Sequence, residues 1–315
     1  MSTLIKPTGL DPTGGSAQPQ LRAARHQSTR REQLGDLLRF IRRNPNLAWG
    51  ILLLGALAVF AVVGAMTTNP AQARPLSAPP LLPPSADYPF GTDRLGRNLY
   101  ATVVAGIPLT FQIGLIAGLI GVGIGTVLGF FAAYYGGWVD SIISGIVDVG
   151  LTIPGLMILI ILGISFSGRL TVGAMALIVG VIAWLHPTRV IRSQVLTMKE
   201  RPYVEVARLS GMGSWEIIFL ELIPNLLPFL AASLVSAVSS AVLASIGLEA
   251  LGLGPIDSPT LGMTIYWAIL DGAVINRWWW WWMPPIAAIS LLFLGLFLLS
   301  MGLDEIANPR VRERV

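Results

Sequence analysis

Long apolar stretches separated by polar segments dominate the chain and predict membrane-spanning helices. Residues 47–66 are almost uninterrupted apolar positions, enough to cross ~30 Å of hydrocarbon at ~1.5 Å per residue. We expect the other spans at 104–134, 139–166, 170–185, 226–248 and 283–301. The pattern therefore predicts an all-α polytopic membrane protein of six transmembrane helices, with its membrane domain over residues 47–303.

A polar island at 200–224 separates the fourth and fifth expected spans. Its first part, up to Leu209, consists of adequate helix formers, and Gly211 and Gly213 then predict a turn. A second helix should follow, until Pro224 changes the direction of the chain. Its apolar stripe would consist of Trp215, Ile218, Phe219 and Leu222. Two short helices between two spans predict a knob that protrudes from the bilayer and that a soluble partner can grip.

The segments outside the spans differ in composition. Residues 1–32 are rich in Ser, Thr, Gly, Pro, Gln and Arg and predict a disordered tail. Residues 33–46 alternate apolar and basic positions, which predicts an amphipathic helix on the surface of the membrane lipid. We expect polar connections at 67–98 and 255–277 and a C-terminal tail at 304–315.

Composition excludes several classes of protein. The chain is 54% hydrophobic and 12% charged, which is too apolar for a soluble domain. It contains no cysteine, so disulfides, thiolate nucleophiles and Cys-based metal sites are impossible. Its two histidines do not predict a metal centre. No phosphate-binding loop and no catalytic Ser/His/Asp constellation is present in the sequence, so we expect a chain that is not itself an enzyme.

The distribution of basic residues predicts the orientation of the chain. Six spans place both termini on one side, and this side, together with the polar island, would carry sixteen of the Lys and Arg residues, against five on the other side. Basic residues favour the cytoplasmic side. We therefore expect both termini and the 200–224 island in the cytoplasm. The net charge of +4 thus indicates membrane topology and does not indicate nucleic-acid binding.

A few residues inside the spans suggest special roles. Asp148 either reaches the membrane interface or lines a translocation path, because ionisable groups in spans usually face protein or water. Glu249 is a second candidate for the path and is expected at the external membrane face, partly buried. Pro154 should kink the third span, and His186-Pro187 should end the fourth.

Two residue types recur in runs. Five tryptophans at 278–282 predict an aromatic belt at the membrane interface. The alternative is a stacking surface for an incoming solute such as a sugar, to which only one or two of these rings could contribute. A stripe of small residues in the second span predicts close helix packing. It is formed by Gly114, Gly118, Gly121, Gly125 and Gly129.

Four motifs carry a resemblance to the permeases of ABC importers. Residues 90–98, FGTDRLGRN, closely resemble the FGTDxLGRD signature of oligopeptide-type permeases, with Asn98 in place of Asp. Residues 205–224 are similar to the EAA loop of these permeases at three places: Glu205-Val206-Ala207, Gly211 and Ile223-Pro224. Residues 248–254, LEALGLG, resemble their LSFLGLG stretch, although Glu249 stands where a small polar residue is usual. Residues 304–310, DEIANPR, also resemble the C-terminal pattern of these permeases, an acidic pair followed by Asp or Asn, Pro and Arg.

The resemblance is to the C-type permease subunit of the dipeptide/oligopeptide ABC importer family and covers nearly the whole chain. It implies the type I importer fold in a bacterial or archaeal cytoplasmic (inner) membrane. It also implies a second related permease subunit, two ABC ATPase subunits and an extracytoplasmic solute-binding protein. ATP and Mg²⁺ would be bound by the ATPases, so no cofactor is expected in this chain. The 200–224 loop would be the part that couples to the ATPases. Its candidate coupling residues are Glu205, Ala207, Gly211, Met212, Trp215, Glu216 and Pro224.

The substrate class stays open from the sequence. Related permeases handle peptides, oligosaccharides and nickel chelates, and Glu249 and the tryptophan run leave a cello-type oligosaccharide as the alternative to a peptide. A channel or secondary transporter that works alone, and a membrane scaffold without a solute, are rival classes. Few charged residues lie in the spans, which disfavours the stand-alone transporter.

Overall fold

The computed structural model describes residues 44–166 and 170–307. The tail 1–32, nearly all of the expected surface helix 33–46 and the terminal residues 308–315 lie outside the described residues. Of the described residues, 46–166 and 170–307 belong to one compact unit.

All regular elements of the described residues are helices, apart from one isolated bridge between Thr92 and Asn98. Four continuous helices are long and apolar enough to cross a membrane: α3 (Pro45–Thr67), α4 (Leu99–Tyr135), the composite helix Ser214–Ala250 and α13 (Trp279–Ala307). Two bent pairs supply the other spans: α5 (Gly137–Thr152) with α6 (Gly155–Ser165), and α7 (Val172–Ala183) with α8 (Leu185–Met198). With each pair counted as one span, the expected six-span fold is confirmed.

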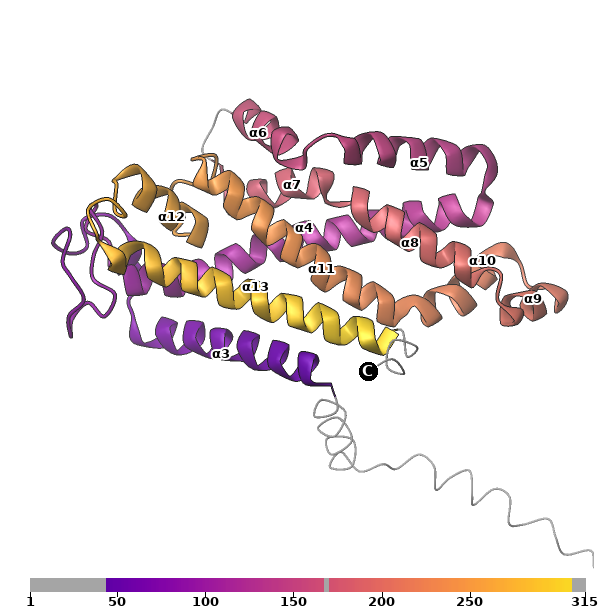
Figure 1. Cartoon of the computed structure of the whole chain (residues 1–315), viewed down its shortest axis with the longest axis horizontal. Coiled ribbons are helices and arrows are strands. Elements are labelled where there is room, and N and C mark those ends of the chain that lie inside the picture. Colours follow the sequence, from indigo (N-terminus) through magenta and orange to yellow (C-terminus); the bar gives the residue numbers. More distant parts are fainter. Residues whose placement is uncertain (1–43, 167–169, 308–315) are drawn as a thin grey trace, which may run out of the picture. The chain divides into compact units, whose positions relative to one another are not determined.

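Helix α4 lies at the centre of the bundle, packed against α7, α8 and α11 (Ile223–Ala250) (Figure 1). Its glycine stripe makes this packing possible. A Cβ on Gly114 or Gly118 would collide with Val242 or Val238 of α11, and the remaining glycines meet the α7–α8 pair in the same way. Because no side chain separates the backbones, the helices approach closely, and the predicted packing role of the stripe is confirmed.

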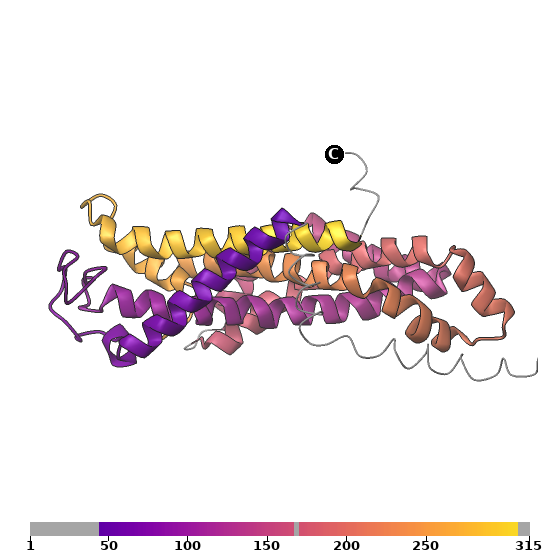
Figure 2. The same cartoon turned by 90° about the horizontal axis from the view of Figure 1, so that it is seen from below.

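Helix α3 runs obliquely from the end of α13 to the start of α4 (Figure 2). Gly302 lies against the backbone of Leu47, and Gly50 against the backbone of Leu299. At the other end of α3, Gly64 meets the side chain of Val104. The Asn46 amide also donates to Glu305 Oε1 at 2.7 Å, so polar and small residues together join the first and last spans.

The third and fourth spans are broken more sharply than the sequence predicts. At Ile153-Pro154 the chain turns by 84° between α5 and α6, so Pro154 marks a break and not the expected kink. The expectation that His186-Pro187 ends the fourth span is wrong. The bend of 44° lies at Trp184, and both residues belong to the first turn of α8, where proline costs no backbone hydrogen bond.

The composite helix Ser214–Ala250 corrects a third expectation, the role of Pro224. It consists of α10 (Ser214–Glu216), the π-helical turn η3 (Ile217–Leu222) and α11. Pro224 lies in the first turn of α11 and does not change the direction of the chain. Pro224 follows closely after the π turn, and the helix continues without a break. The polar island is therefore continuous with the fifth span.

At the opposite end of the bundle, connection 67–98 folds onto the start of α4. It includes the short helix η2 (Pro70–Ala73). Asn98 caps α4 through its side-chain oxygen, which accepts from Tyr100 N and Ala101 N. Arg97 Nε donates to the buried Asp93 Oδ2 at 2.5 Å. The FGTDRLGRN segment is thus a capped turn held by an internal ion pair.

The second connection, 255–277, is not the polar excursion that we expected, because it contains the apolar helix α12 (Leu261–Leu270). The tryptophan run begins α13 beside it. Trp281 is fully buried in a cluster with Leu99, Ala268 and Ala273, and three of the other tryptophans pack partly buried around it. Only Trp279 is more than half exposed. Trp281 therefore belongs to a packed cluster, while the aromatic belt and the stacking surface for a solute stay predictions.

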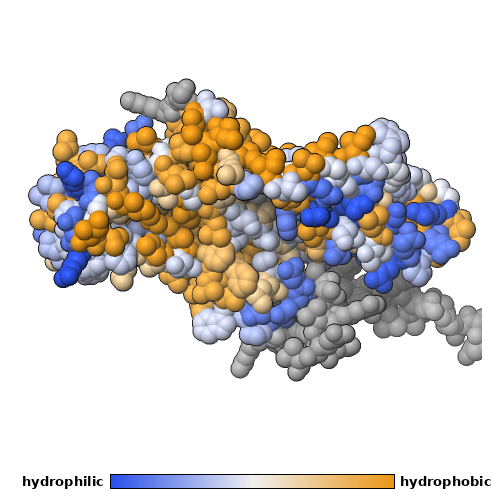
Figure 3. Space-filling model, turned by 45° about the horizontal axis from the view of Figure 1, so that its top comes forward, coloured by the Kyte–Doolittle hydropathy of each residue, from blue (hydrophilic) through white to orange (hydrophobic). Residues whose placement is uncertain are grey.

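Figure 3 shows how the residues are distributed over one face. Hydrophobic residues cover the middle of this face and hydrophilic residues gather at its two ends. We refer to these ends as the α9 end, which carries helix α9 (Pro202–Leu209), and the α12 end. This distribution is typical of a protein that crosses a bilayer.

Candidate functional site

The first candidate site is residues 200–224, which we call the docking loop. Arg201 begins α9 in an extended conformation, and Pro202 takes the first helical position, where its missing N–H is harmless. Gly211 ends the helix with a positive φ of 84°. Gly211 N donates to Arg208 O at 3.0 Å and Met212 N to Ala207 O at 3.2 Å, which is the Schellman arrangement.

One face of the docking loop is buried in the bundle. Val204 and Ala207 of α9 pack with Met212 against Ile217 and Ile218 of the next helix. This cluster continues into α4, α8 and the start of α11. The predicted coupling residue Ala207 therefore supports the loop from inside, whereas Met212 is only partly buried.

The opposite face of α9 is open. Glu205 is exposed on it, next to Val206 and Leu209, whose exposed fractions are 61% and 82%. Large apolar side chains at the polar end of a membrane protein are costly unless they meet a partner. The exposure of Val206 and Leu209 was not predicted from the sequence. The spacing of Val204 and Ala207, which share the buried face of the helix, is the signal that indicates it.

Two further predicted residues, Trp215 and Glu216, lie in the short helix α10. Trp215 is 54% exposed and contacts the ring of Phe131 edge to face, and the ring of Phe219 stacks on it. Glu216 accepts from the Gly213 backbone N–H at 2.8 Å, which ties the start of α10. The predicted stripe is therefore divided, because Ile218 and Leu222 are buried while Trp215 and Phe219 are exposed.

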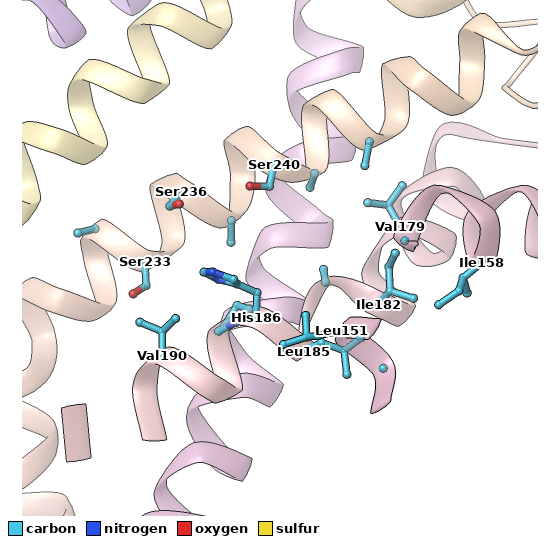
Figure 4. Close-up of a pocket in the computed structure, with 18 of the residues that line it drawn as sticks. Leu151, Ile158, Val179, Ile182, Leu185, His186, Val190, Ser233, Ser236 and Ser240 are labelled. Carbon is cyan, nitrogen blue, oxygen red and sulfur yellow. The ribbon is translucent and has the colours of Figure 1, made fainter. Parts of the chain in front are cut away.

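The second candidate site is a groove of about 440 Å³ between α11, the α7–α8 bend and the α5–α6 break. Ser233, Ser236 and Ser240 of α11 point into it, opposite His186 and Val190 of α8 (Figure 4). The 84° break and the 44° bend lie beside the groove, since Ile153 and Leu185 belong to its lining. Asp304 is the acidic residue of the lining.

The groove combines polar donors with very small side chains. Alanines alternate with the serines along α11, at 232, 237, 241 and 244. Hydroxyls and one imidazole can bind neutral polar groups, while the small side chains leave room for varied shapes. Sequence reasoning missed this site, although the serines at 233, 236 and 240 share one helical face, which is unusual in an apolar span.

The two acidic candidates for the path do not line this groove. Asp148 of α5 is 57% exposed and forms an ion pair of 3.0 Å with Arg189 of α8. Nearby, Arg192 of α8 binds Asp140 of α5 through two hydrogen bonds. Glu249 is completely buried, so the expected partial burial at the membrane face is wrong. Its hydrogen bonds to Thr260 and Met263 fix the start of α12.

Six spans, a protruding docking loop and a polar groove along the fifth span define the class of a membrane-embedded permease. A family model described as "Binding-protein-dependent transport system inner membrane component" matches residues 125–313, and the chain belongs to this family. It is therefore a multi-pass protein of the inner membrane and a component of a transport system that depends on a binding protein.

Individual relatives agree with the family. The dipeptide transport system permease protein DppC of Bacillus subtilis (strain 168) is 31% identical over 281 residues, which cover 88% of this chain and 86% of the relative. The glutathione transport system permease protein GsiD of Pectobacterium atrosepticum is 29% identical over 231 residues, which cover 73% of this chain and 75% of the relative. The oligopeptide transport system permease protein OppC of Mycobacterium tuberculosis (strain ATCC 25618 / H37Rv) is 28% identical over 233 residues, which cover 74% of this chain and 79% of the relative.

Proposed function

We propose that the chain is a permease subunit of an ATP-driven importer of di- and oligopeptides. It contributes half of the translocation path, and it receives work from ATPase subunits through the docking loop. ATP and Mg²⁺ are bound by those partner chains, and this chain carries out no chemistry of its own. The observation that carries the proposal is one uninterrupted helix, Ser214–Ala250, which joins the docking loop to the serines of the groove.

Coupling follows from this continuity. The exposed side chains Val206 and Leu209 give α9 an apolar contact surface, and the buried side chains Val204 and Ala207 fix α9 to the helix bundle. When an ATPase displaces the docking loop, α11 is displaced with it, because the buried cluster and the continuous helix connect the two rigidly. The groove residues on α11 move with it and open the path alternately to either side.

The assembly that we propose has two membrane subunits, since the groove is open on the surface of this chain and needs a second wall. Ser236, Ser240 and His186 are exposed beside it. A second related permease supplies the other wall, two ABC ATPases bind at the α9 end, and a solute-binding protein delivers solute at the α12 end. The α9 end and both termini face the cytoplasm.

A peptide is the substrate that we favour. The relatives named above are dipeptide, glutathione and oligopeptide permeases. Serine hydroxyls can both donate to peptide carbonyls and accept from peptide N–H groups, while alanines tolerate differing side chains. Oligosaccharides also offer hydroxyls, so peptides and cello-type oligosaccharides should be compared directly, as ligands of the cognate solute-binding protein and as solutes taken up by the complex.

Leu209→Glu tests the coupling role. A charge on the exposed apolar face of α9 should weaken binding of the ATPase subunits at least tenfold, because central apolar anchors of interfaces often contribute about 2 kcal/mol or more. The measurement is co-purification of the ATPases with the permease, together with ATP-dependent peptide uptake in proteoliposomes.

Leu76→Glu is the matched control, because Leu76 is 92% exposed in connection 67–98, at the α12 end. This variant should retain the ATPases. If Leu209→Glu binds the ATPases and transports as the parent chain does, the docking loop is not the coupling element.

A further inference from the structure

Glu249 joins two elements at the α12 end. Its Oε2 accepts from Thr260 Oγ1 at 2.7 Å and from Met263 N at 3.1 Å. Thr260 is the N-cap of α12, and its Oγ1 also accepts from Met263 N at 3.3 Å. The carboxyl group at the end of α11 therefore holds the first turn of α12, whose N–H groups lack partners within their own helix.

The backbone around Glu249 is shaped to admit this large side chain. A Cβ on Gly262 would collide with the carboxyl group of Glu249, and a Cβ on Gly254 would lie 2.7 Å from its Cγ. Glu249 is fully buried, like Thr260. Two glycines that leave space for one buried acidic residue indicate a specific contact and not a side chain that happens to be near.

The same turn of α12 has a second, separate attachment. Leu261 N donates to Thr110 Oγ1 of α4 at 3.0 Å. Thr110 thus links α12 to α4, whereas Glu249 links it to α11. The two attachments differ in one respect that matters for transport, because only α11 is continuous with the docking loop.

From this geometry we propose that Glu249 is a positioning residue that makes α12 move with α11. When the docking loop displaces the Ser214–Ala250 helix, its far end carries α12 and the tryptophan cluster packed on α12, so that the two ends of the permease change together. The inference rests on the function proposed above and assigns to Glu249 the transmission of movement. It replaces the expectation that Glu249 lines the path.

The absence of cysteine in the chain allows a direct test by spin labelling. Labels are placed on Ala231→Cys of α11 and Ile269→Cys of α12, both exposed, and the permease is assembled with its partner chains in proteoliposomes. Electron–electron double resonance measures the α11–α12 separation with and without trapped nucleotide. With Glu249 present we expect one narrow distance distribution that is the same in both states.

Variants give the second readout, the number of peptides imported per ATP hydrolysed. Glu249→Ala should lower this ratio several-fold and broaden the distance distribution, while ATP hydrolysis continues. Glu249→Gln, which retains an acceptor oxygen in the same place, should recover most of the ratio. Thr110→Val is the control, since it removes the equally buried attachment to α4 and should leave the α11–α12 separation unchanged. A purely structural defect would lower uptake and hydrolysis together and leave their ratio intact.

The outcomes separate this inference from the function on which it rests. If the parent chain shows an α11–α12 separation that changes with nucleotide, or if Glu249→Ala keeps the parent ratio, the inference is overturned while ATP-driven uptake stands. If Glu249→Ala fails to assemble, the α11–α12 distances measured in the parent chain and in Glu249→Gln still test the inference. It is overturned if these distances change with nucleotide. An absence of ATP-dependent uptake in the parent complex would overturn the proposed function instead.

Discussion

Gly211 fixes the geometry of the docking loop at the scale of a single residue. Its φ of 84° lies in the left-handed region, which disfavours every residue with a Cβ. No atom lies within 4 Å of the place where its Cβ would be, so the requirement for glycine is conformational and not steric. Gly213, two positions later, has a φ of −70°, which is sterically allowed for any L-residue.

Gly211→Ala should therefore destabilise the end of α9 by about 1 kcal/mol. That energy corresponds to roughly fivefold faster hydrogen exchange of the α9 amides, if they exchange by local opening. Hydrogen exchange with mass spectrometry on the purified permease measures this effect. Gly213→Ala is the matched control and should exchange as the parent chain does; equal effects of the two substitutions would contradict the conformational argument.

At the scale of elements, the α4 glycine stripe decides how the spans pack. Gly118 lies so close to α11 that a Cβ would be 2.7 Å from Val238 Cγ2 and 3.0 Å from Val238 N. The valine side chain can rotate away, but the backbone atoms of α11 cannot. On the same helix, Gly123 has no neighbour within 4 Å.

Gly118→Ala should separate α4 from α11 and lower the free energy of unfolding by about 1–3 kcal/mol, the usual cost of overpacking. A decrease of several degrees in the melting temperature of the detergent-solubilised permease would report this loss. Gly123→Ala should leave the melting temperature unchanged or raise it slightly, because alanine favours helix more than glycine does. Equal melting temperatures for both variants would mean that the close approach of α4 and α11 does not contribute to stability.

At the scale of the whole membrane unit, arginines lie at both polar ends. Arg201 and Arg208 lie in the docking loop at the α9 end, and Arg189 and Arg192 lie on α8, which leads into it. At the α12 end, Arg94 is paired with Asp271 and Arg97 with Asp93. Arg189 and Arg192 are paired in the same way, with Asp148 and Asp140. Ion pairs therefore do not distinguish the two ends, and the orientation stays a prediction from the number of basic residues on each side.

Single cysteines test this orientation, since the chain has none of its own. A membrane-impermeant thiol reagent added to intact cells should label Leu76→Cys and Ile275→Cys, whose side chains are 92% and 86% exposed. It should reach Leu209→Cys, 82% exposed in the native chain, only after the membrane is permeabilised. The reverse pattern would place the docking loop outside the cell and remove the basis of the coupling proposal.

Particular residues show where sequence reasoning succeeded and where it failed. The spans, the Gly211 turn and the packing role of the α4 glycines depend on local periodicity and backbone preference, and the structure agrees with the prediction. Pro224 and His186-Pro187 were assigned wrong roles, because a proline is tolerated at the start of a helix and only the neighbouring hydrogen bonds reveal that the helix continues.

The sequence by itself determined that this protein is a six-span permease with a docking loop, because hydrophobic lengths, glycine spacing and short motifs are local properties of the chain. Only the tertiary structure decided the place of Glu249, the burial of Trp281 and the groove of Ser233, Ser236 and Ser240. Each of these depends on contacts between residues far apart in the sequence, such as Glu249 with α12 and α11 with the α7–α8 bend. No local pattern specifies which side chains such contacts will enclose and which they will leave open.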